Sequence, residues 1–295
     1  MLNLDLKKIL SSLIARERSL FPSHLPHQLK ELYLSNAILS FALSSAIVFE
    51  PVYLYTIGFP LYKIMLFYFG VYLAYFFLMP LGGRIVKRNG FEHGMMYGSF
   101  FMILYYVFLL AIQVNPNFVL LAILALAIQK SVFWPSYHAD FAFFSQSGER
   151  GREIGNIIAL DSLLTILGPV VSGLVVALFG FPGLFALLCI VVILSNVPFF
   201  LAKEQFTPSD LSYTAAYRAL VAKENRRYFF GYLGFGEELI VLTVWPIFVY
   251  LTFNNVFSTG FVAAVSTLIT SLVLLYVGRA SDLRNRKCIL RIGSV

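Results

Sequence analysis

Apolar residues fill long, nearly uninterrupted blocks along this chain, and short polar segments separate the blocks. An apolar run of about 20 residues crosses the hydrocarbon core of a bilayer as a helix. The pattern therefore predicts an all-α fold, a polytopic membrane helix bundle with eight spans. The expected spans are Tyr33–Ile57, Leu61–Pro80, Gly94–Val114, Phe118–Phe144, Ile154–Phe179, Gly183–Leu201, Tyr228–Phe253 and Thr259–Val277.

The polar connections alternate in character, and this alternation predicts the orientation of the chain. On one side lie the short turns Gly58–Pro60, Asn115–Asn117, Phe181–Pro182 and Asn254–Asn255. Apart from Lys63 near the first turn and Lys130 inside a span, all of the 22 lysine and arginine residues lie on the other side. Because basic residues accumulate on the cytoplasmic side, we expect the N-terminus in the cytoplasm of a multi-pass protein of the plasma membrane.

Four parts follow from this organisation. Residues 1–30 predict an amphipathic segment on the cytoplasmic membrane surface, with a frayed tail as the alternative. Residues 31–202 predict a six-helix bundle, and residues 203–227 a cytoplasmic linker helix. Residues 228–295 predict a partial second bundle, with two helices and the start of a third.

Composition narrows the function classes. With 59% hydrophobic and 13% charged residues, the chain has about half the charged fraction of a soluble domain. The net charge is +7, but the basic residues lie between blocks of spanning length. This arrangement indicates membrane orientation and not nucleic-acid binding. No phosphate-binding glycine loop or metal-ligand spacing is present, so we expect no ATP, cofactor or metal. The partner expected from composition is the lipid bilayer.

Two basic breaks follow the second and the eighth apolar block. The first runs from Gly83 to Gly90, and the second begins at Gly278, 195 residues later. At the same offset Pro51 corresponds to Pro246, at matching depth in the first and seventh spans. Parallel repeats of this kind are one way to build a transporter.

These breaks resemble the loop signature of the major facilitator superfamily, which is Gly, three residues, Asp, a basic residue, one residue, Gly and two basic residues. The first copy keeps Gly83, Arg88 and Gly90, but has Lys87 at the acidic position and Phe91-Glu92 at the final basic pair. The second copy keeps Gly278, Asp282, Arg286 and Lys287, and departs from the signature at Leu283 and Asn285.

The resemblance implies a transporter that is truncated after its eighth helix. Its central cavity would be lined by helices one, four, seven and ten, and rocking of two halves would give alternating access. The segment Gly168-Pro169-Val170-Val171-Ser172-Gly173 is similar to a motif of the family's antiporters and hints at export. Close helix packing through small residues is the simpler interpretation of Gly168, Pro169 and Gly173.

Charged residues inside spans are costly and usually functional, so they are the first candidates for the transport pathway. Glu50 and Lys130 could pair across the cavity. Glu238, preferred over its neighbour because Trp245 lies one heptad later on nearly the same face, could carry a proton. Further candidates for the substrate and proton pathway are Trp134, Tyr137 and His138. The prolines expected to bend cavity-facing helices are Pro51, Pro135 and Pro246.

The first basic break is expected to act in gating, with Glu92 contacting Arg150 or Arg152. The leading hypothesis is a secondary active transporter of a small organic solute, with a proton as the candidate coupling ion. A truncated or non-transporting membrane protein is the alternative. A membrane enzyme resembling an acyltransferase, centred on His138-Ala139-Asp140, is the least favoured hypothesis, so we expect no enzymatic activity.

Overall fold

The structure, a computed structural model, describes residues 27–144, 150–200, 206, 212–226, 230 and 236–283. Of these, the side chains of residues 27–29, 150–161, 237–239 and 274–283 are not described. Most of the predicted N-terminal segment, together with Arg286 and Lys287, lies outside the described residues.

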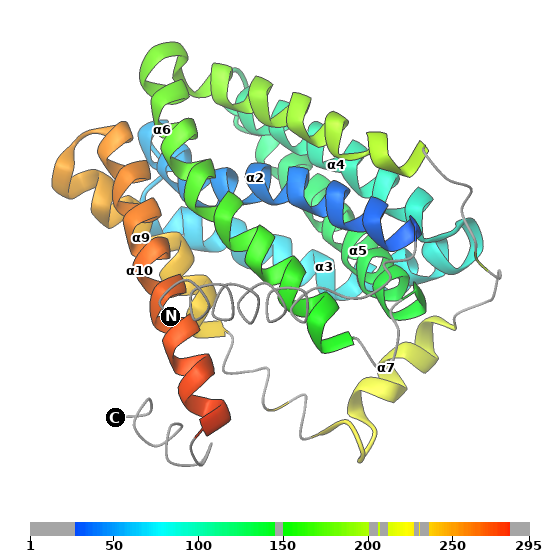
Figure 1. Cartoon of the computed structure of the whole chain (residues 1–295). Coiled ribbons are helices and arrows are strands. Elements are labelled where there is room, and N and C mark those ends of the chain that lie inside the picture. Colours follow the sequence, from blue (N-terminus) through cyan, green and yellow to red (C-terminus); the bar gives the residue numbers. More distant parts are fainter. Residues whose placement is uncertain are drawn as a thin grey trace, which may run out of the picture.

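The described residues form helices and no strands, so the predicted all-α membrane bundle is confirmed. Six helical stretches among them are long and apolar enough to cross a membrane. The helices are α2 (His27–Thr56), α3 (Leu61–Asn89), α4 (Phe91–Ala111), α5 (Phe118–Phe144), α6 (Arg150–Ser195), α7 (Tyr213–Val221), α9 (Gly236–Phe253) and α10 (Val256–Leu283), with the 3₁₀ helix η1 (Val197–Phe200). Figure 1 shows α9 and α10 beside the bundle of α2 to α6, and α7 at the edge of that bundle.

The long helix α6 makes two passes. Its 46 residues would extend about 69 Å at 1.5 Å per residue, more than twice the thickness of the hydrocarbon core. Gly180, with φ 69° and ψ −178°, breaks the helix into two limbs that meet at a sharp corner in Figure 1. The limbs correspond to the predicted fifth and sixth spans, and the corner directly precedes the expected turn at Phe181–Pro182.

The third helix, α3, extends beyond its predicted end at Pro80 and continues to Asn89. Gly83, Lys87 and Arg88 therefore lie on a helix and not in a loop, which corrects the expected loop conformation of the first basic break. Proline removes one N–H from the helix ladder, so a prediction from sequence ends the helix there. The structure supplies another donor at this point.

That donor comes from α7, a helix that lies within residues 203–227. Pro80 has no N–H to offer the carbonyl oxygen of Phe76, four residues earlier, and the hydroxyl of Tyr217 donates to this oxygen at 2.7 Å. Tyr213 donates to the next carbonyl oxygen, that of Phe77, at 3.1 Å. Desolvation, with the nearby Tyr213 hydroxyl, raises the pKa of Tyr217 to about 12, so the hydroxyl remains a donor at neutral pH.

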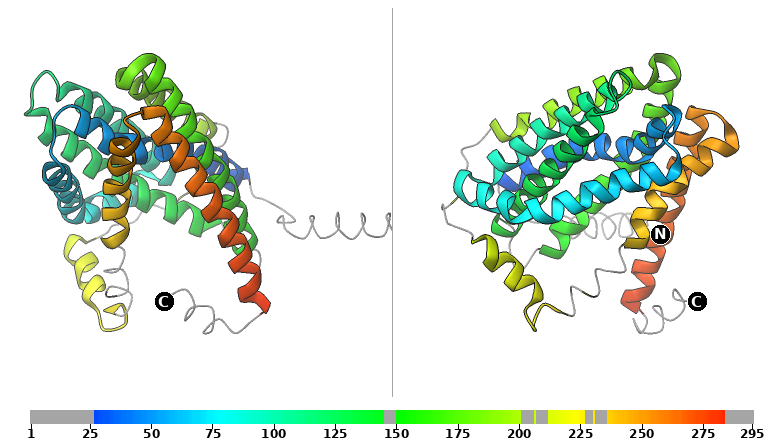
Figure 2. Two further views of the ribbon diagram at one scale, coloured as in Figure 1. Left: turned by 90° about the vertical axis from the view of Figure 1, so that its left-hand side faces the viewer. Right: turned by 180° about the vertical axis from the view of Figure 1, so that it is seen from behind.

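Helices of the first bundle approach one another closely where glycine faces a neighbour. A methyl group on Gly82 of α3 would collide with the backbone oxygen of Ser131 on α5. One on Gly98 of α4 would lie 2.7 Å from the Cβ of Phe133, also on α5. Small residues allow this approach in lipid, where packing and not water exclusion holds helices together. Figure 2 shows α3, α4 and α5 running alongside one another.

The buried core around α2 is aromatic. Tyr53 packs edge-on against Phe185 at 5.1 Å, and Tyr106 stacks on the same ring at 5.6 Å. The Tyr53 hydroxyl donates to the backbone oxygen of Leu109 at 3.1 Å, which ties α2 to α4. Glu50, one turn before Tyr53, is therefore held beside a rigid apolar cluster.

Candidate transport cavity

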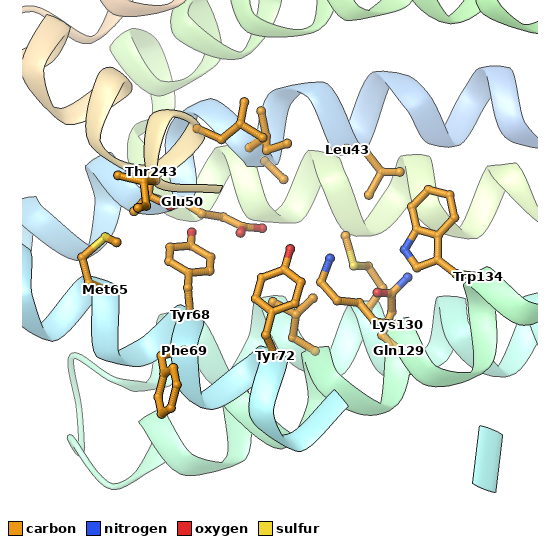
Figure 3. A pocket seen from close by; sticks show the side chains of 16 residues that line it. Leu43, Glu50, Met65, Tyr68, Phe69, Tyr72, Gln129, Lys130, Trp134 and Thr243 are labelled. Atoms are coloured by element: carbon orange, nitrogen blue, oxygen red, sulfur yellow. The ribbon is translucent and has the colours of Figure 1, made fainter. Parts of the chain in front are cut away.

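A cavity of about 360 Å³ lies between the spanning helices α2, α3, α5 and α9, with one residue from α4. Its walls are mostly apolar, and a few polar side chains project into it (Figure 3). Such a cavity, apolar with a few directed polar groups, is typical of a small-molecule site. The lining residues are Leu43, Ala46, Ile47, Glu50, Met65, Tyr68, Phe69, Tyr72, Met102, Leu126, Gln129, Lys130, Trp134, Ile240, Leu242 and Thr243.

Glu50 is the acidic group of this cavity. Its side chain is only 6% exposed, and Pro51 follows it in α2. The carboxyl group interacts with the hydroxyl groups of Tyr105 and Tyr68, from α4 and α3. The Tyr105 hydroxyl is buried and makes no hydrogen bond of standard geometry with any described residue, so its contact with the acid is electrostatic.

Lys130 of α5 is the basic group. Its ammonium nitrogen lies 5.4 Å from the centre of the Tyr72 ring, within range of a cation–π interaction. Lys130 and Glu50 interact electrostatically across the cavity. Both side chains are described, and they form no direct ion pair within 4.0 Å. The structure thus brings the two predicted charges to one cavity without joining them.

The aromatic residues that follow Lys130 divide between the cavity and the surface. Trp134 lines the cavity, and its ring stacks on that of His138 at 5.9 Å. His138 is exposed, whereas Asp140 is buried at 2% exposure. Tyr137 and His138 do not line the cavity. The proposed enzyme centre is thus divided between an exposed imidazole and a buried carboxyl group.

A second cavity, of about 420 Å³, adjoins the first and lies between α2, α6, α9 and α10. The two cavities share Leu43, Ile47 and Leu242. Trp245 and Pro246 line the second cavity, so the two tryptophans of the chain occupy different cavities. Its hydroxyl-bearing lining residues are Ser40, Ser44, Thr165, Thr259, Ser266 and Thr267.

A sequence profile described as Major Facilitator Superfamily matches residues 32–295 of this chain. The chain belongs to the major facilitator superfamily. Its fold is similar to that of a solved structure, the in meso crystal structure of the POT family transporter PepTSo, with a TM-score of 0.54 and 14% sequence identity. That similarity covers 68% of this chain and 43% of the transporter, so the chain spans less than half of the solved protein's length. No curated protein matches.

The first copy of the superfamily signature lies at the junction of α3 and α4. Gly90, with φ 108°, joins α3 to α4, and this positive φ favours glycine. Lys87 and Arg88 are exposed in the last turn of α3, where basic groups complement the helix dipole. Glu92, 5% exposed, lies in the first turn of α4, where an acid is favoured.

Several predicted site residues have backbones in the described helices but no described side chains. They are Arg150 and Arg152 on α6, Glu238 on α9, and Gly278 and Asp282 on α10. The proposed contact of Glu92 with an arginine and the proton-carrying role of Glu238 therefore stay predictions. Among the described side chains, no group of three or more His, Cys, Asp or Glu could hold a metal ion.

The antiporter-like segment lies at two helix contacts of α6. A methyl group on Gly168 would collide with the Ser44 hydroxyl of α2, and one on Gly173 would lie 3.2 Å from the Cα of Phe257 on α10. Pro135 continues α5 one residue after Trp134, inside the helix. The two glycines are placed where they let α6 approach α2 and α10 closely.

Sequence analysis missed the polar groups that surround the two charges. Tyr68 and Tyr72 are four residues apart and therefore share one face of α3, which was a usable signal. Gln129 adjoins Lys130 in sequence, and Thr243 comes from α9. A single amide or hydroxyl side chain is not unusual in a spanning helix, so nothing in the sequence marked Gln129 or Thr243 as a cavity residue.

Proposed function

We propose that this chain is a secondary transporter that moves a small organic solute across the membrane by alternating access. Membership of the superfamily supports the class of protein. The observation that carries the proposal is a cavity between spanning helices that holds both Glu50 and Lys130. Desolvation makes a charge inside the membrane costly, so such charges are usually retained only where function requires them, as in a transport pathway.

Alternating access fits the composition of the cavity walls. Glu50, Tyr68 and Lys130 come from the first six-helix bundle, whereas Ile240 and Thr243 come from α9 of the predicted second bundle. A solute in this cavity would contact both bundles at once. Rocking of one bundle against the other would then change which side of the membrane the solute faces.

Coupling to protons is part of the proposal. Protonation of Glu50 would remove the negative charge that faces Lys130 and change the field that a solute meets in the cavity. Glu238 is a second candidate, on the same helix as Thr243. The direction that we favour is export, because the Gly168–Gly173 segment is similar to the antiporter motif.

Transport by the purified chain in proteoliposomes tests this function. Vesicles would be loaded with a defined mixture of amino acids, sugars, organic acids and organic cations, and release would be followed by mass spectrometry with and without an imposed proton gradient. We expect release of one class, driven by the gradient, and a loss of roughly tenfold or more in rate for Glu50→Gln and Lys130→Met.

Lys63→Met is the matched control. Lys63 is exposed in the first turn of α3, so this substitution removes the same positive charge outside the cavity. It should leave the rate unchanged. Release that is indifferent to both Glu50→Gln and Lys130→Met would argue against this cavity as the pathway. Release that depends on Glu50 but not on the gradient would remove the proton from the mechanism.

A further inference from the structure

The cavity presents two opposite charges that do not neutralise each other directly. The carboxyl group of Glu50 enters from α2 and the ammonium group of Lys130 from α5, and no direct ion pair forms between these two described residues. In Figure 3 both side chains project into the same cavity, on opposite walls. Two charges that share one apolar cavity but stay apart leave room for a ligand between them.

Each charge has its own polar setting. Hydroxyl groups from Tyr68 and Tyr105 face the Glu50 carboxyl, so a positively charged group there would meet an anion supported by two tyrosines. Lys130 lies over the Tyr72 ring, which supports its positive charge but leaves its N–H groups able to donate to an anion. The two ends of the cavity are therefore suited to groups of opposite sign.

The remaining wall is apolar and aromatic. Trp134, Met65 and Phe69 line the cavity, with aliphatic side chains from α2, α5 and α9. The volume of about 360 Å³ lies within the range of small-molecule sites and is larger than a single ion needs. A ligand with an apolar side group would gain free energy from these walls, since burial of apolar surface is favourable.

We propose that this cavity selects zwitterionic solutes that carry an ammonium group, a carboxylate group and an apolar side group. The ammonium group would bind at Glu50 and Tyr68, and the carboxylate group at Lys130. This inference rests on the proposed function and names its substrate class. It also gives the cavity two anchors, which fix the orientation of the solute before the bundles move.

Ligands of other charge types would leave an imbalance. A purely cationic solute would satisfy Glu50 but place a second positive charge near Lys130. A purely anionic solute would do the reverse, and a neutral one would leave both charges separated in an apolar cavity. An uncompensated charge in such surroundings is costly, so each of these ligands would bind more weakly than a zwitterion of the same shape.

The fluorescence of Trp134 provides a direct test of binding. The chain has two tryptophans, and Trp245 lines the other cavity, so Trp245→Phe leaves Trp134 as the single reporter. The full chain with this substitution, in lipid nanodiscs, would be titrated with four probes of one shape. The probes are phenylalanine (zwitterion), phenylalanine amide (cation), N-acetylphenylalanine (anion) and N-acetylphenylalanine amide (neutral).

We expect phenylalanine to bind roughly tenfold or more tightly than each of the other three. Equal or tighter binding of the cation, the anion or the neutral probe would overturn the inference, as would the absence of any response to all four. The preferred probe should also change according to which charge is removed from the cavity. Glu50→Gln should make the anion the preferred probe, and Lys130→Met should make the cation the preferred probe.

This reversal separates a specific role from a folding defect, since a damaged protein would lose all four responses together. Lys63→Met, outside the cavity, should keep the zwitterion preference. The outcome is also distinct from that of the transport assay. Zwitterion-selective binding without movement across the vesicle membrane would defeat the proposed function alone, and transport without charge preference would defeat this inference alone.

Discussion

At the scale of single residues, the most informative pair is Glu50 and Lys130. Each is a charge inside a spanning helix, and the two interact across a cavity without direct contact. Either one alone would be a charge without a counter-charge in a mostly apolar cavity. Together they reduce the electrostatic cost that each imposes on the fold, even though the desolvation of both remains.

We therefore expect the single variants Glu50→Gln and Lys130→Met each to lower the free energy of unfolding by about 2 kcal/mol, less than the loss of a directly paired buried charge. The double variant should lose less than the sum of the two, because it leaves no unbalanced charge. Thermal unfolding of the purified protein in detergent would measure all three. Lys63→Met should melt like the unmodified protein, and strictly additive losses would show that the two charges are independent.

The residue scale also shows how far sequence alone could go. Glu50 and Lys130 could be predicted because a charge inside an apolar block is rare and must be accounted for. Tyr68 and Tyr72 share one face of α3 through their four-residue spacing and so left a signal, whereas Tyr105 is one of 17 tyrosines and left none. Only the rotation of α3 and α4 about their axes decides which hydroxyl groups reach the acid.

At the scale of secondary-structure elements, α7 and α3 form a specific contact. The carbonyl oxygen of Phe76 lacks the helical donor that Pro80 cannot provide, and the hydroxyl of Tyr217 takes its place. Sequence predicted a helix in the linker and an end of the second span at Pro80. The continuation of α3 to Asn89 depends on a partner 137 residues after the proline, which no local pattern contains.

Tyr217→Phe should loosen α7 from α3, because the carbonyl oxygen of Phe76 then loses its donor at a cost of about 1 kcal/mol. Hydrogen–deuterium exchange should rise in residues 213–221. Pro80→Ala restores a helical N–H to Phe76, so the same tyrosine substitution should have a smaller effect in that background. An equal rise in both backgrounds would show that the ring of Tyr217, and not its hydroxyl group, holds α7.

At the scale of the whole molecule, the apolar blocks predicted the fold well. The bounds of α5 match the expected span from Phe118 to Phe144, and α10 begins within three residues of its prediction. Block length and the spacing of polar turns are sufficient for this, because lipid requires each helix to satisfy its own backbone. The packing between α2, α6 and α10 is set by shape complementarity and could not be predicted in the same way.

The predicted orientation is testable with single cysteines. After replacement of Cys189 and Cys288 by serine, a cysteine at Asn117 should react with a membrane-impermeant maleimide added to intact cells. A cysteine at Lys223 should react only after the membrane is opened. Both positions are exposed, so access from one side, and not burial, decides the result. The opposite pattern would invert the topology that the basic residues predict.

The corner of α6 has a consequence for how the protein is made. Within α6 only Gly180 departs from helical geometry, so the corner between the two limbs has almost no polar segment that could remain behind while one limb enters the bilayer alone. The stretch from Ser162 to Phe200, 39 residues of high hydropathy, should enter the bilayer as one helical hairpin during synthesis. Biogenesis of this region is then a single insertion step, and a polar insertion at the corner would divide it into two.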